Sequence, residues 1–234
     1  MSLPVAILAG GLATRLRPLT EKIPKALIDV CGQPFILRQL NYLKQQGVTR
    51  VVLCTGYLGE QIEVVVGNGR SMGLDVSYSP DGPLLLGTGG ALLKALPLLE
   101  RNFFVLYGDS FLPCDFRRVQ AAFEAAGTQA LITVLKNSNR WDKSNVLFRD
   151  GKLVEYNKSF PKPEMEYIDY GLGILSAEVF MEYPSGQPLD LADIYHRLSL
   201  SGLLSGVEVN ERFYEIGSHS GLMETEKYFL AQET

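Results

Sequence analysis

The sequence predicts an α/β protein built as a single domain on one doubly wound, mixed and mostly parallel sheet. Short apolar runs without polar alternation recur between amphipathic stretches in the first half of the chain, a pattern typical of strands that are covered on both faces. The second half is richer in turns, but no linker, repeat or low-complexity tract separates it from the first. A chain of 234 residues that is 46% hydrophobic can bury one sizeable core.

The first half alternates between expected strands and expected helices. The apolar runs that predict strands are 5–9, 50–55, 74–78, 103–107 and 130–135. Apolar residues at helical spacing predict helices over 36–43, 62–66, 92–99 and 119–123, the third of them after Gly89-Gly90. Such alternation of strand and helix predicts crossover connections and a parallel sheet.

The second half has a different pattern. Residues 145–148 and 152–156 flank the turn Arg149-Asp150-Gly151, which predicts an antiparallel hairpin. The elements expected after it are an apolar stretch over 171–175, helices over 177–183 and 189–200, short strands over 206–209 and 213–216, and a terminal helix over 220–231. We expect these elements to complete the same sheet.

Charge and composition exclude several classes of protein. Lys and Arg number 22 against 26 Asp and Glu, a net charge of −4, whereas a non-specific nucleic-acid binder needs a basic surface. The three separated cysteines, Cys31, Cys54 and Cys114, predict buried free thiols in a reducing compartment and not a disulfide framework. The first apolar run is too short for a signal peptide, and no run reaches the roughly 20 residues of a membrane span. We therefore expect a cytoplasmic protein with no nucleic-acid or membrane partner.

The two histidines give no metal site. His196 and His219 lie far in sequence from other residues of the metal-ligating types, so the spacing does not predict a zinc cluster.

A long loop after the first expected strand carries the strongest functional signal. It begins at Gly10-Gly11 and contains four cations, Arg15, Arg17, Lys22 and Lys25. Pro18 and Pro24 prevent the loop from forming one helix. Glycine amides that approach an anion closely, together with these cations, outline a triphosphate cradle. A tight turn with solvated cations is the alternative, but four cations at one strand end of an acidic protein favour the cradle. The spacing matches neither the dinucleotide nor the P-loop pattern.

Two carboxylates are candidate ligands of Mg²⁺ at the same edge of the sheet. Asp109 follows the fourth expected strand within Gly108-Asp109-Ser110, and Glu215 interrupts an apolar strand near the C-terminus. Carboxylate oxygens suit Mg²⁺, although an Asp after a strand is more often a turn or cap residue and a lone Glu can face solvent. Between them, Thr88 can cap a helix in Leu86-Gly87-Thr88-Gly89-Gly90. These glycines allow a flat base to lie against the backbone, and a plain helix start explains them equally well.

Together these segments resemble the sugar-1-phosphate nucleotidyltransferase family. Its leading signature, L-A-G-G-x-G-T-R-L-x-P-L-T followed by P-K-x-L, is matched by residues 8–20 and 24–27, with Ala13 in place of the usual Gly. Residues 86–91 match L-G-T-x-G-A, and 108–110 match G-D-S/T. Residues 156–159 match the E-K-P-like sugar-phosphate motif in part, because Asn157 stands where an acid is usual. Residues 213–218 match W-x-D-x-G-T with Glu215 in place of Asp.

The resemblance implies a Rossmann-like fold of the nucleotide-diphospho-sugar transferase type, with residues 1–135 as the nucleotide half and 136–234 as the sugar-phosphate half. We expect a monomer or homodimer. The roles that the resemblance carries over are nucleotide binding by Leu8, Ala9, Gly10, Gly11, Gly87, Thr88 and Asp109, catalysis by Arg15 and Lys25, sugar-phosphate binding by Asn145, Lys158 and Gly171, and Mg²⁺ ligation by Asp109 and Glu215.

The implied reaction is transfer of a nucleoside monophosphate from a triphosphate to a sugar 1-phosphate. Length and the segments 107–110 and 168–171 most resemble bacterial enzymes that act on heptose, mannose or N-acetylmuramate 1-phosphates. We expect a manno-configured hexose or heptose 1-phosphate with GTP as the donor. The base itself is not readable, although Asp81 or Gly82 lies near the usual base-reading position.

Two alternatives stay open from the sequence. A phosphocholine-type cytidylyltransferase needs an aromatic or acidic cage for a quaternary ammonium, and Trp141, Tyr156, Tyr167 and Tyr170 are available for one. Lys158 favours an anionic acceptor instead. A catalytically silent nucleotide-sugar-binding module is the other alternative, and the presence of Arg15, Lys25 and Asp109 speaks against it.

Overall fold

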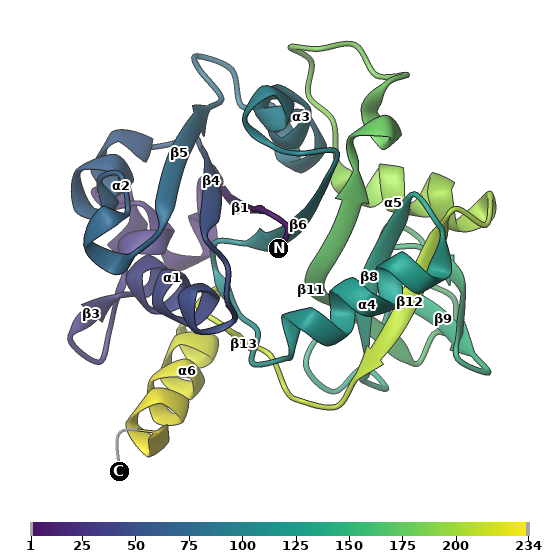
Figure 1. Ribbon diagram of the computed structural model, residues 1–234. Helices are drawn as coiled ribbons and strands as arrows, with labels where there is room; N and C mark the ends of the chain where they lie inside the picture. The colour runs from purple at the N-terminus through teal and green to yellow at the C-terminus, as the bar shows by residue number, and fades with distance from the viewer. Residues whose placement is uncertain (1, 233–234) are drawn as a thin grey trace.

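A computed structural model describes residues 2–232 of the chain (Figure 1). Nine strands form one mixed sheet, and only two of them, β10 and β11, run against the direction of the rest. The strands of this sheet are β1 (Val5–Ala9), β4 (Arg50–Thr55), β5 (Asp75–Pro80), β6 (Asn102–Tyr107), β8 (Ala130–Lys136), β9 (Val146–Arg149), β10 (Lys152–Tyr156), β11 (Tyr167–Ser176) and β12 (Leu204–Val209). The mixed, mostly parallel sheet that the sequence predicts is confirmed.

The strand order places a crevice at the centre of the sheet. The order is β5-β4-β1-β6-β11, with β8 and β12 beyond β11, and β9 and β10 beside its first residues. The chain moves outward from β1 through β4 to β5 and then returns to the other side of β1 as β6. The loops after β1 and β6 therefore leave the sheet in opposite directions, and ligands of open α/β sheets bind at such a point.

Helices cover both faces of the sheet (Figure 1). On one face lie α1 (Phe35–Gln45), α2 (Gly59–Val66) and α4 (Phe116–Ala126), and on the other lie α3 (Gly87–Ala95) and α5 (Leu191–Leu200). The side chains of β1 alternate between the two layers, because Val5 and Ile7 pack in the first core and Ala6 packs in the second. Both cores are apolar, which is why the strands read as continuous hydrophobic runs.

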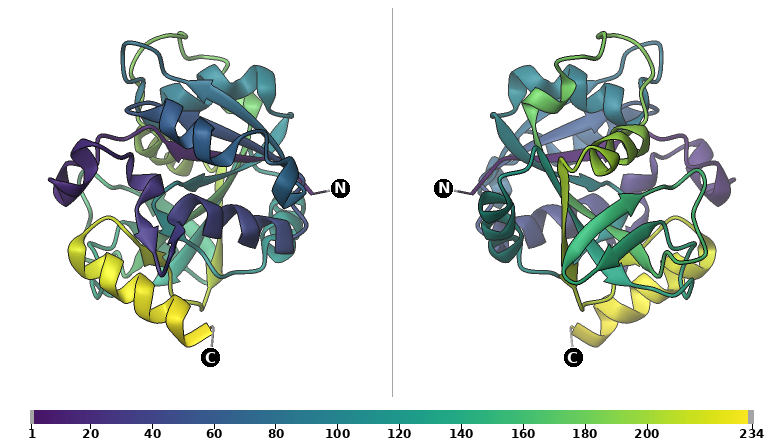
Figure 2. Two further views of the ribbon diagram at one scale, coloured as in Figure 1. Left: turned by 90° about the vertical axis from the view of Figure 1, so that its left-hand side faces the viewer. Right: turned by 90° about the vertical axis from the view of Figure 1, so that its right-hand side faces the viewer.

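A third, smaller core holds the C-terminal helix against the loop that follows β1 (Figure 2). Helix α6 (His219–Gln232) contributes Phe229, which is buried with Leu16, Phe35 and Ile216. Four strands of two residues each lie outside the main sheet, namely β2 (Asp29–Val30), β3 (Gln33–Pro34), β7 (Ser110–Phe111) and β13 (Tyr214–Glu215). Except for β13, the sequence does not predict them, because two residues are too few to show a periodicity.

Helix α3 begins earlier than the sequence predicts. Gly89 and Gly90 lie inside the helix and not before it. A Cβ atom at Gly89 would lie 2.9 Å from Leu189 Cγ, and one at Gly90 would lie 2.8 Å from the Gln187 carbonyl oxygen. These two glycines therefore serve close packing of α3 against the segment before α5.

The expectation that Thr88 caps α3 is wrong. The Thr88 hydroxyl accepts a hydrogen bond from the Leu191 N–H at 2.8 Å and donates one to Asp190 Oδ1 at 2.9 Å. Asp190 itself caps α5 by accepting the Ala192 N–H. Thr88 thus connects the first turn of α3 to the first turn of α5.

Other expectations hold with shifted boundaries. Strand β11 starts four residues before the predicted stretch 171–175, and the helix predicted over 177–183 is one 3₁₀ turn, Ala177–Phe180. Cys54 and Cys114 are buried free thiols as predicted, whereas Cys31 is only half-buried, because it lies in the exposed turn between β2 and β3.

Gly173, in the middle of β11, offers a test of this packing. A Cβ atom there would lie 2.7 Å from the Tyr195 hydroxyl oxygen and 3.1 Å from the Leu131 carbonyl oxygen. We expect Gly173→Ala to lower the free energy of unfolding in urea by about 1–3 kcal/mol. Adding Tyr195→Phe should recover part of that loss, because it removes the nearer of the two atoms. A Gly173→Ala protein as stable as the wild type would contradict the packing described here.

Candidate active site

A cavity of about 400 Å³ opens where the loops after β1 and β6 diverge. All nine residues that the sequence analysis assigns to the nucleotide and to catalysis line it, namely Leu8, Ala9, Gly10, Gly11, Arg15, Lys25, Gly87, Thr88 and Asp109. The fold therefore brings segments from three separate parts of the chain into one site.

The loop after β1 supplies the two cations of this cavity. It folds as three successive 3₁₀ turns, Thr14–Leu16, Leu19–Glu21 and Lys25–Leu27, and not as one helix. Arg15 and Lys25 line the cavity, whereas Arg17 and Lys22 are exposed and do not. The predicted cradle of four cations is thus reduced to two, because Arg17 and Lys22 follow the ends of the first and second turns and do not line the cavity.

The turn after β6 presents Asp109 to the same cavity. The Gly108 N–H donates to the Leu8 carbonyl oxygen at 2.9 Å, and a Cβ atom at Gly108 would lie 3.0 Å from Ala9 Cβ. The turn therefore lies directly against the end of β1. Lys25 Nζ is 2.5 Å from Asp109 Oδ2, which makes the ion pair that joins the two loops.

Glu215 reaches the site through a short antiparallel strand pair. In the β7–β13 pair, Glu215 lies opposite Ser110, and the Ile216 N–H donates to the Asp109 carbonyl oxygen at 2.9 Å. The next residue, Gly217, lines the cavity. A Cβ atom there would lie 3.2 Å from Lys25 Nζ, with an Arg15 guanidinium nitrogen at 3.4 Å and Glu215 Oε1 at 3.5 Å.

Two cations and two carboxylates thus meet around Gly217, and we call Arg15, Lys25, Asp109 and Glu215 the charge cluster. Burial and the neighbouring Asp109 raise the pKa of Glu215, and Lys25 and Arg15 act in the opposite direction. A pair of adjacent carboxylates is a suitable donor set for Mg²⁺, which keeps several waters and also takes phosphate oxygens. Within residues 2–232, no group of three or more His, Cys, Asp or Glu side chains forms an all-protein metal site.

A second cavity, of about 510 Å³, adjoins the first. Tyr107 lines both cavities, and Glu215 lies in the wall of the second. The residues that the sequence analysis assigns to the sugar phosphate, Asn145, Lys158 and Gly171, all line this second cavity. The charge cluster therefore stands between two spaces of the size that a nucleotide and a sugar phosphate need.

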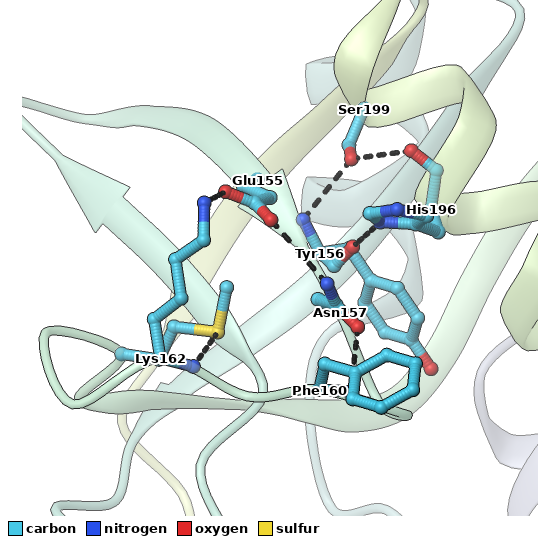
Figure 3. A network of polar contacts seen from close by, with 8 residues as sticks. Glu155, Tyr156, Asn157, Phe160, Lys162, His196 and Ser199 are labelled. Atoms are coloured by element: carbon cyan, nitrogen blue, oxygen red, sulfur yellow. Dashed lines mark hydrogen bonds and ion pairs between the residues drawn. The ribbon is translucent and has the colours of Figure 1, made fainter.

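Asn157, which stands in place of the usual acid of the sugar-phosphate motif, does not line the second cavity. Its Oδ1 accepts the Phe160 N–H at 2.8 Å, and its Nδ2 points toward Glu155 Oε1 at 3.5 Å (Figure 3). Glu155 in turn forms an ion pair with Lys162. The Asn157 amide is thus used to hold the loop that follows β10.

The same network fixes the end of β10 on helix α5 (Figure 3). The Tyr156 N–H donates to the Ser199 hydroxyl at 3.1 Å, and the Tyr156 carbonyl oxygen lies 2.6 Å from His196 Nδ1. Both neighbours of Asn157, Tyr156 and Lys158, do line the second cavity. The network therefore fixes the backbone that immediately precedes Lys158.

Asp169 is a carboxylate of the second cavity that the sequence analysis does not single out. Its Oδ1 accepts the Gly171 N–H at 3.0 Å, and its own N–H donates to Asn145 Oδ1 at 2.9 Å. Burial raises the pKa of Asp169 to about 6, against the opposing effects of the Gly171 N–H and of Lys158. The sequence pattern that drew attention to Glu215, an acidic residue within an apolar strand, would also have identified Asp169.

Three of the four aromatic residues considered for a choline cage, Trp141, Tyr156 and Tyr170, line the second cavity. Tyr167 packs on Phe148 at a ring distance of 5.1 Å and does not line the second cavity. Trp141 does line it, but the guanidinium groups of Arg140 and Arg212 already lie 4.9 and 5.5 Å from its ring. Cations beside the indole disfavour a cationic acceptor.

Asp81, which directly follows β5, also lines the first cavity. Its Oδ2 accepts the Leu86 N–H at 3.1 Å, whereas its Oδ1 is buried without a hydrogen-bond partner among the described residues. Burial raises the pKa of Asp81, and the Leu86 N–H and Lys94 oppose that shift. Gly82, the other candidate for reading the base, does not line the cavity.

Comparison with known proteins agrees with this geometry. A sequence profile of the nucleotidyl transferase family matches residues 5–145. The N-acetylmuramate alpha-1-phosphate uridylyltransferase of Neisseria meningitidis is 32% identical over 226 residues, which cover 94% of this chain and 95% of the relative. The chain belongs to the nucleotidyl transferase family. The predicted family and enzyme class are therefore confirmed.

Two further members show the range of this family. The D-glycero-alpha-D-manno-heptose 1-phosphate guanylyltransferase of Aneurinibacillus thermoaerophilus is 35% identical over 156 residues, 65% of this chain and 66% of that protein. This chain spans 59% of the longer UTP–glucose-1-phosphate uridylyltransferase of Synechocystis. The crystal structure of HddC from Yersinia pseudotuberculosis, complexed with GMP-PN, superposes with a TM-score of 0.78 at 24% identity and covers 97% of this chain and 99% of its own. This likeness confirms the predicted fold.

None of the helices within residues 2–232 is long and apolar enough to cross a membrane.

The raised pKa of Asp169 gives a testable dependence of stability on pH. The pKa of Asp169 rises from 3.8 to about 6 on folding, so ionisation of this carboxyl lowers the stability of the folded protein. The loss of stability is absent below about pH 4, grows between about pH 4 and 6, and is constant above about pH 6. Asp169→Asn should therefore raise the free energy of unfolding at pH 8, by at most about 3 kcal/mol, and leave it unchanged at pH 4. A difference between the two proteins that is the same at both pH values would contradict this account.

Proposed function

We propose that this protein transfers a nucleoside monophosphate from a nucleoside triphosphate to a sugar 1-phosphate and releases pyrophosphate. The observation that carries the proposal is the position of the charge cluster, where the cavity behind Gly10-Gly11 meets the cavity that contains Lys158. A triphosphate in the first cavity and a sugar phosphate in the second would bring their reacting groups together there. The relatives from Neisseria and Aneurinibacillus are named for reactions of this class.

The reaction that fits this arrangement is a direct displacement. A phosphate oxygen of the sugar 1-phosphate attacks the α-phosphorus, a new P–O bond forms, and the bond to the bridging oxygen of pyrophosphate breaks with its electron pair leaving on pyrophosphate. Arg15 and Lys25 offset the negative charge that develops on the leaving group, and Lys158 orients the attacking phosphate. No residue needs to form a covalent intermediate.

Asp109 and Glu215 are the side chains that would hold Mg²⁺. Bound there, the ion supplies charge neutralisation to the phosphate oxygens. The fit rests on two oxygen donors at one edge of the cavity, with room around Gly217 that a larger residue would fill.

The donor that we propose is GTP, and the acceptor a manno-configured hexose or heptose 1-phosphate. Asp81 supports guanine, because a carboxylate only accepts hydrogen bonds and guanine presents two adjacent donors, N1–H and the N2 amino group. The unpartnered Oδ1 of Asp81 leaves acceptor capacity for them. The 35% identity to a manno-heptose 1-phosphate guanylyltransferase supports the same pair of substrates.

UTP with N-acetylmuramate 1-phosphate is the second candidate. The observation in its favour is the relative from Neisseria, which aligns over nearly all of both chains. Uracil offers Asp81 only one donor, N3–H. A panel that crosses the common triphosphates with manno-, gluco- and N-acetylmuramate 1-phosphates separates the two candidates by pyrophosphate release.

Lys25 provides the first test of the proposed reaction. With the substrate pair that releases pyrophosphate fastest, Lys25→Ala should lower kcat by about 10²–10³-fold, by analogy with loss of one donor to a developing negative charge. Lys22→Ala is the matched control, because Lys22 comes from the same loop but does not line the cavity, and it should leave kcat within a few-fold of wild type. Pyrophosphate release from no pair, with the triphosphate still bound, would favour a silent nucleotide-sugar-binding module.

Asp81 provides a test of the base. If it reads the N1–H and N2 amino group of guanine, Asp81→Asn should lower kcat/KM for GTP by about 10–100-fold, because it replaces one acceptor with a donor. The same variant should gain activity with xanthosine triphosphate, whose base carries a carbonyl oxygen at position 2. Equal use of GTP by the variant and the wild type would remove Asp81 from base recognition.

A further inference from the structure

Gln39 is a polar residue on the otherwise apolar buried face of helix α1. The helix buries five side chains, and the other four are Phe35, Ile36, Leu40 and Leu43. Gln39 itself is only 3% exposed. A buried amide costs free energy unless its donors and acceptor are paired, so its partners show why a polar side chain is retained there.

Both partners of the Gln39 amide belong to the turn that carries Asp109. Its Nε2 donates to the Tyr107 carbonyl oxygen at 2.9 Å and to the Ser110 carbonyl oxygen at 2.7 Å. These two carbonyls enclose Gly108 and Asp109 in the chain. One NH₂ group thus bridges the start and the end of the turn and fixes the distance between them.

The orientation of the Gln39 amide follows from these partners. Because both are carbonyl oxygens, only the nitrogen of the amide can face them. Its Oε1 is then left buried without a hydrogen-bond partner among residues 2–232, which costs about 1–3 kcal/mol. An apolar side chain would avoid that cost, but it would leave two carbonyl oxygens of the turn without this donor.

The contacts of the turn on its other sides also converge on Asp109. Lys25 pairs with its carboxylate, the Ser110 hydroxyl donates to its Oδ1 at 3.0 Å, and the Ile216 N–H donates to its carbonyl oxygen. The last contact belongs to the β7–β13 pair, which places Glu215 opposite Ser110. Gln39 is therefore the support that helix α1 gives to a turn on which both carboxylates depend.

We propose that Gln39 is a positioning residue, which holds Asp109, and through the β7–β13 pair Glu215, in the arrangement that binds a divalent cation with the triphosphate. This inference rests on the proposed function, because it assumes that Asp109 ligates the cation. Gln39 does not line either cavity, so it acts only through the backbone of the turn.

The test compares Gln39→Met with Tyr42→Phe. Methionine fills nearly the same volume but has no donor for the two carbonyls. Tyr42 lies one turn further along α1, and its hydroxyl donates to the Cys114 carbonyl oxygen at 3.2 Å. Each variant thus loses hydrogen bonding from α1 to a backbone carbonyl, but only Gln39→Met loses it at the turn of Asp109.

The first readout is binding of Mn²⁺ in the presence of α,β-methylene GTP, measured without turnover by the paramagnetic resonance of free Mn²⁺. Gln39→Met should bind Mn²⁺ about 10–100-fold more weakly than wild type, as is typical when a residue that supports a metal ligand is lost. Tyr42→Phe should bind it within a few-fold of wild type. Equal Mn²⁺ binding by the two variants would overturn the proposal.

Steady-state kinetics and two further variants complete the test. In Gln39→Met, kcat should fall and the Mg²⁺ concentration for half-maximal rate should rise, while KM for the triphosphate at saturating Mg²⁺ stays within a few-fold of wild type. Gln39→Asn keeps the amide donor on a shorter side chain, so its affinity for Mn²⁺ should lie between those of Gln39→Met and wild type. It replaces Gln39→Met if that variant does not fold.

Asp109→Ala distinguishes failure of the metal assignment from failure of the role proposed for Gln39. Normal Mn²⁺ binding by Asp109→Ala would refute the assignment of Asp109 as a metal ligand. If Asp109→Ala loses Mn²⁺ binding but Gln39→Met keeps it, only the role of Gln39 is refuted.

Discussion

The site depends on one electrostatic constraint, which is that two carboxylates must share a small space with two cations. Burial, and after it the negative charge of the neighbouring Asp109, raise the pKa of Glu215 there. Lys25 and Arg15 lie within reach of the same space, and Lys25 is paired with Asp109. The same cluster presents two carboxylates that could hold a cation and two cations that could hold a phosphate chain. Gly217 keeps the space between these groups open.

The fold brings this cluster together from distant parts of the chain. Arg15 and Lys25 come from the loop after β1, Asp109 from the turn after β6, and Glu215 from β13 near the C-terminus. The reversal of strand order between β1 and β6 places the first two segments side by side. The small core under α6 anchors the third. The second half of the chain thus completes both the sheet and the site.

The sequence predicts those features that have a local pattern. Continuous apolar runs identify the strands of the doubly wound half, and the glycine loop and Asp109 mark where the cavity forms. Patterns that require a spatial neighbour are not predictable in this way. Gly89 and Gly90 resemble a loop before a helix, but packing against Leu189 makes them part of α3. Gln39 is unremarkable in sequence, because its role depends on carbonyl groups about 70 residues away. Asn157 shows the reverse case, since its motif position predicts a sugar contact while its amide holds a loop.

The central claim is that the charge cluster holds a triphosphate and its cation between the two cavities. A crystal structure with Mg²⁺ and α,β-methylene GTP, or the corresponding analogue of the preferred triphosphate, tests it most directly. We expect phosphates against the amides of Gly10 and Gly11, with Arg15 and Lys25 beside them and Mg²⁺ bound by Asp109 and Glu215. A triphosphate bound outside the first cavity, or a cation that contacts neither carboxylate, would contradict it.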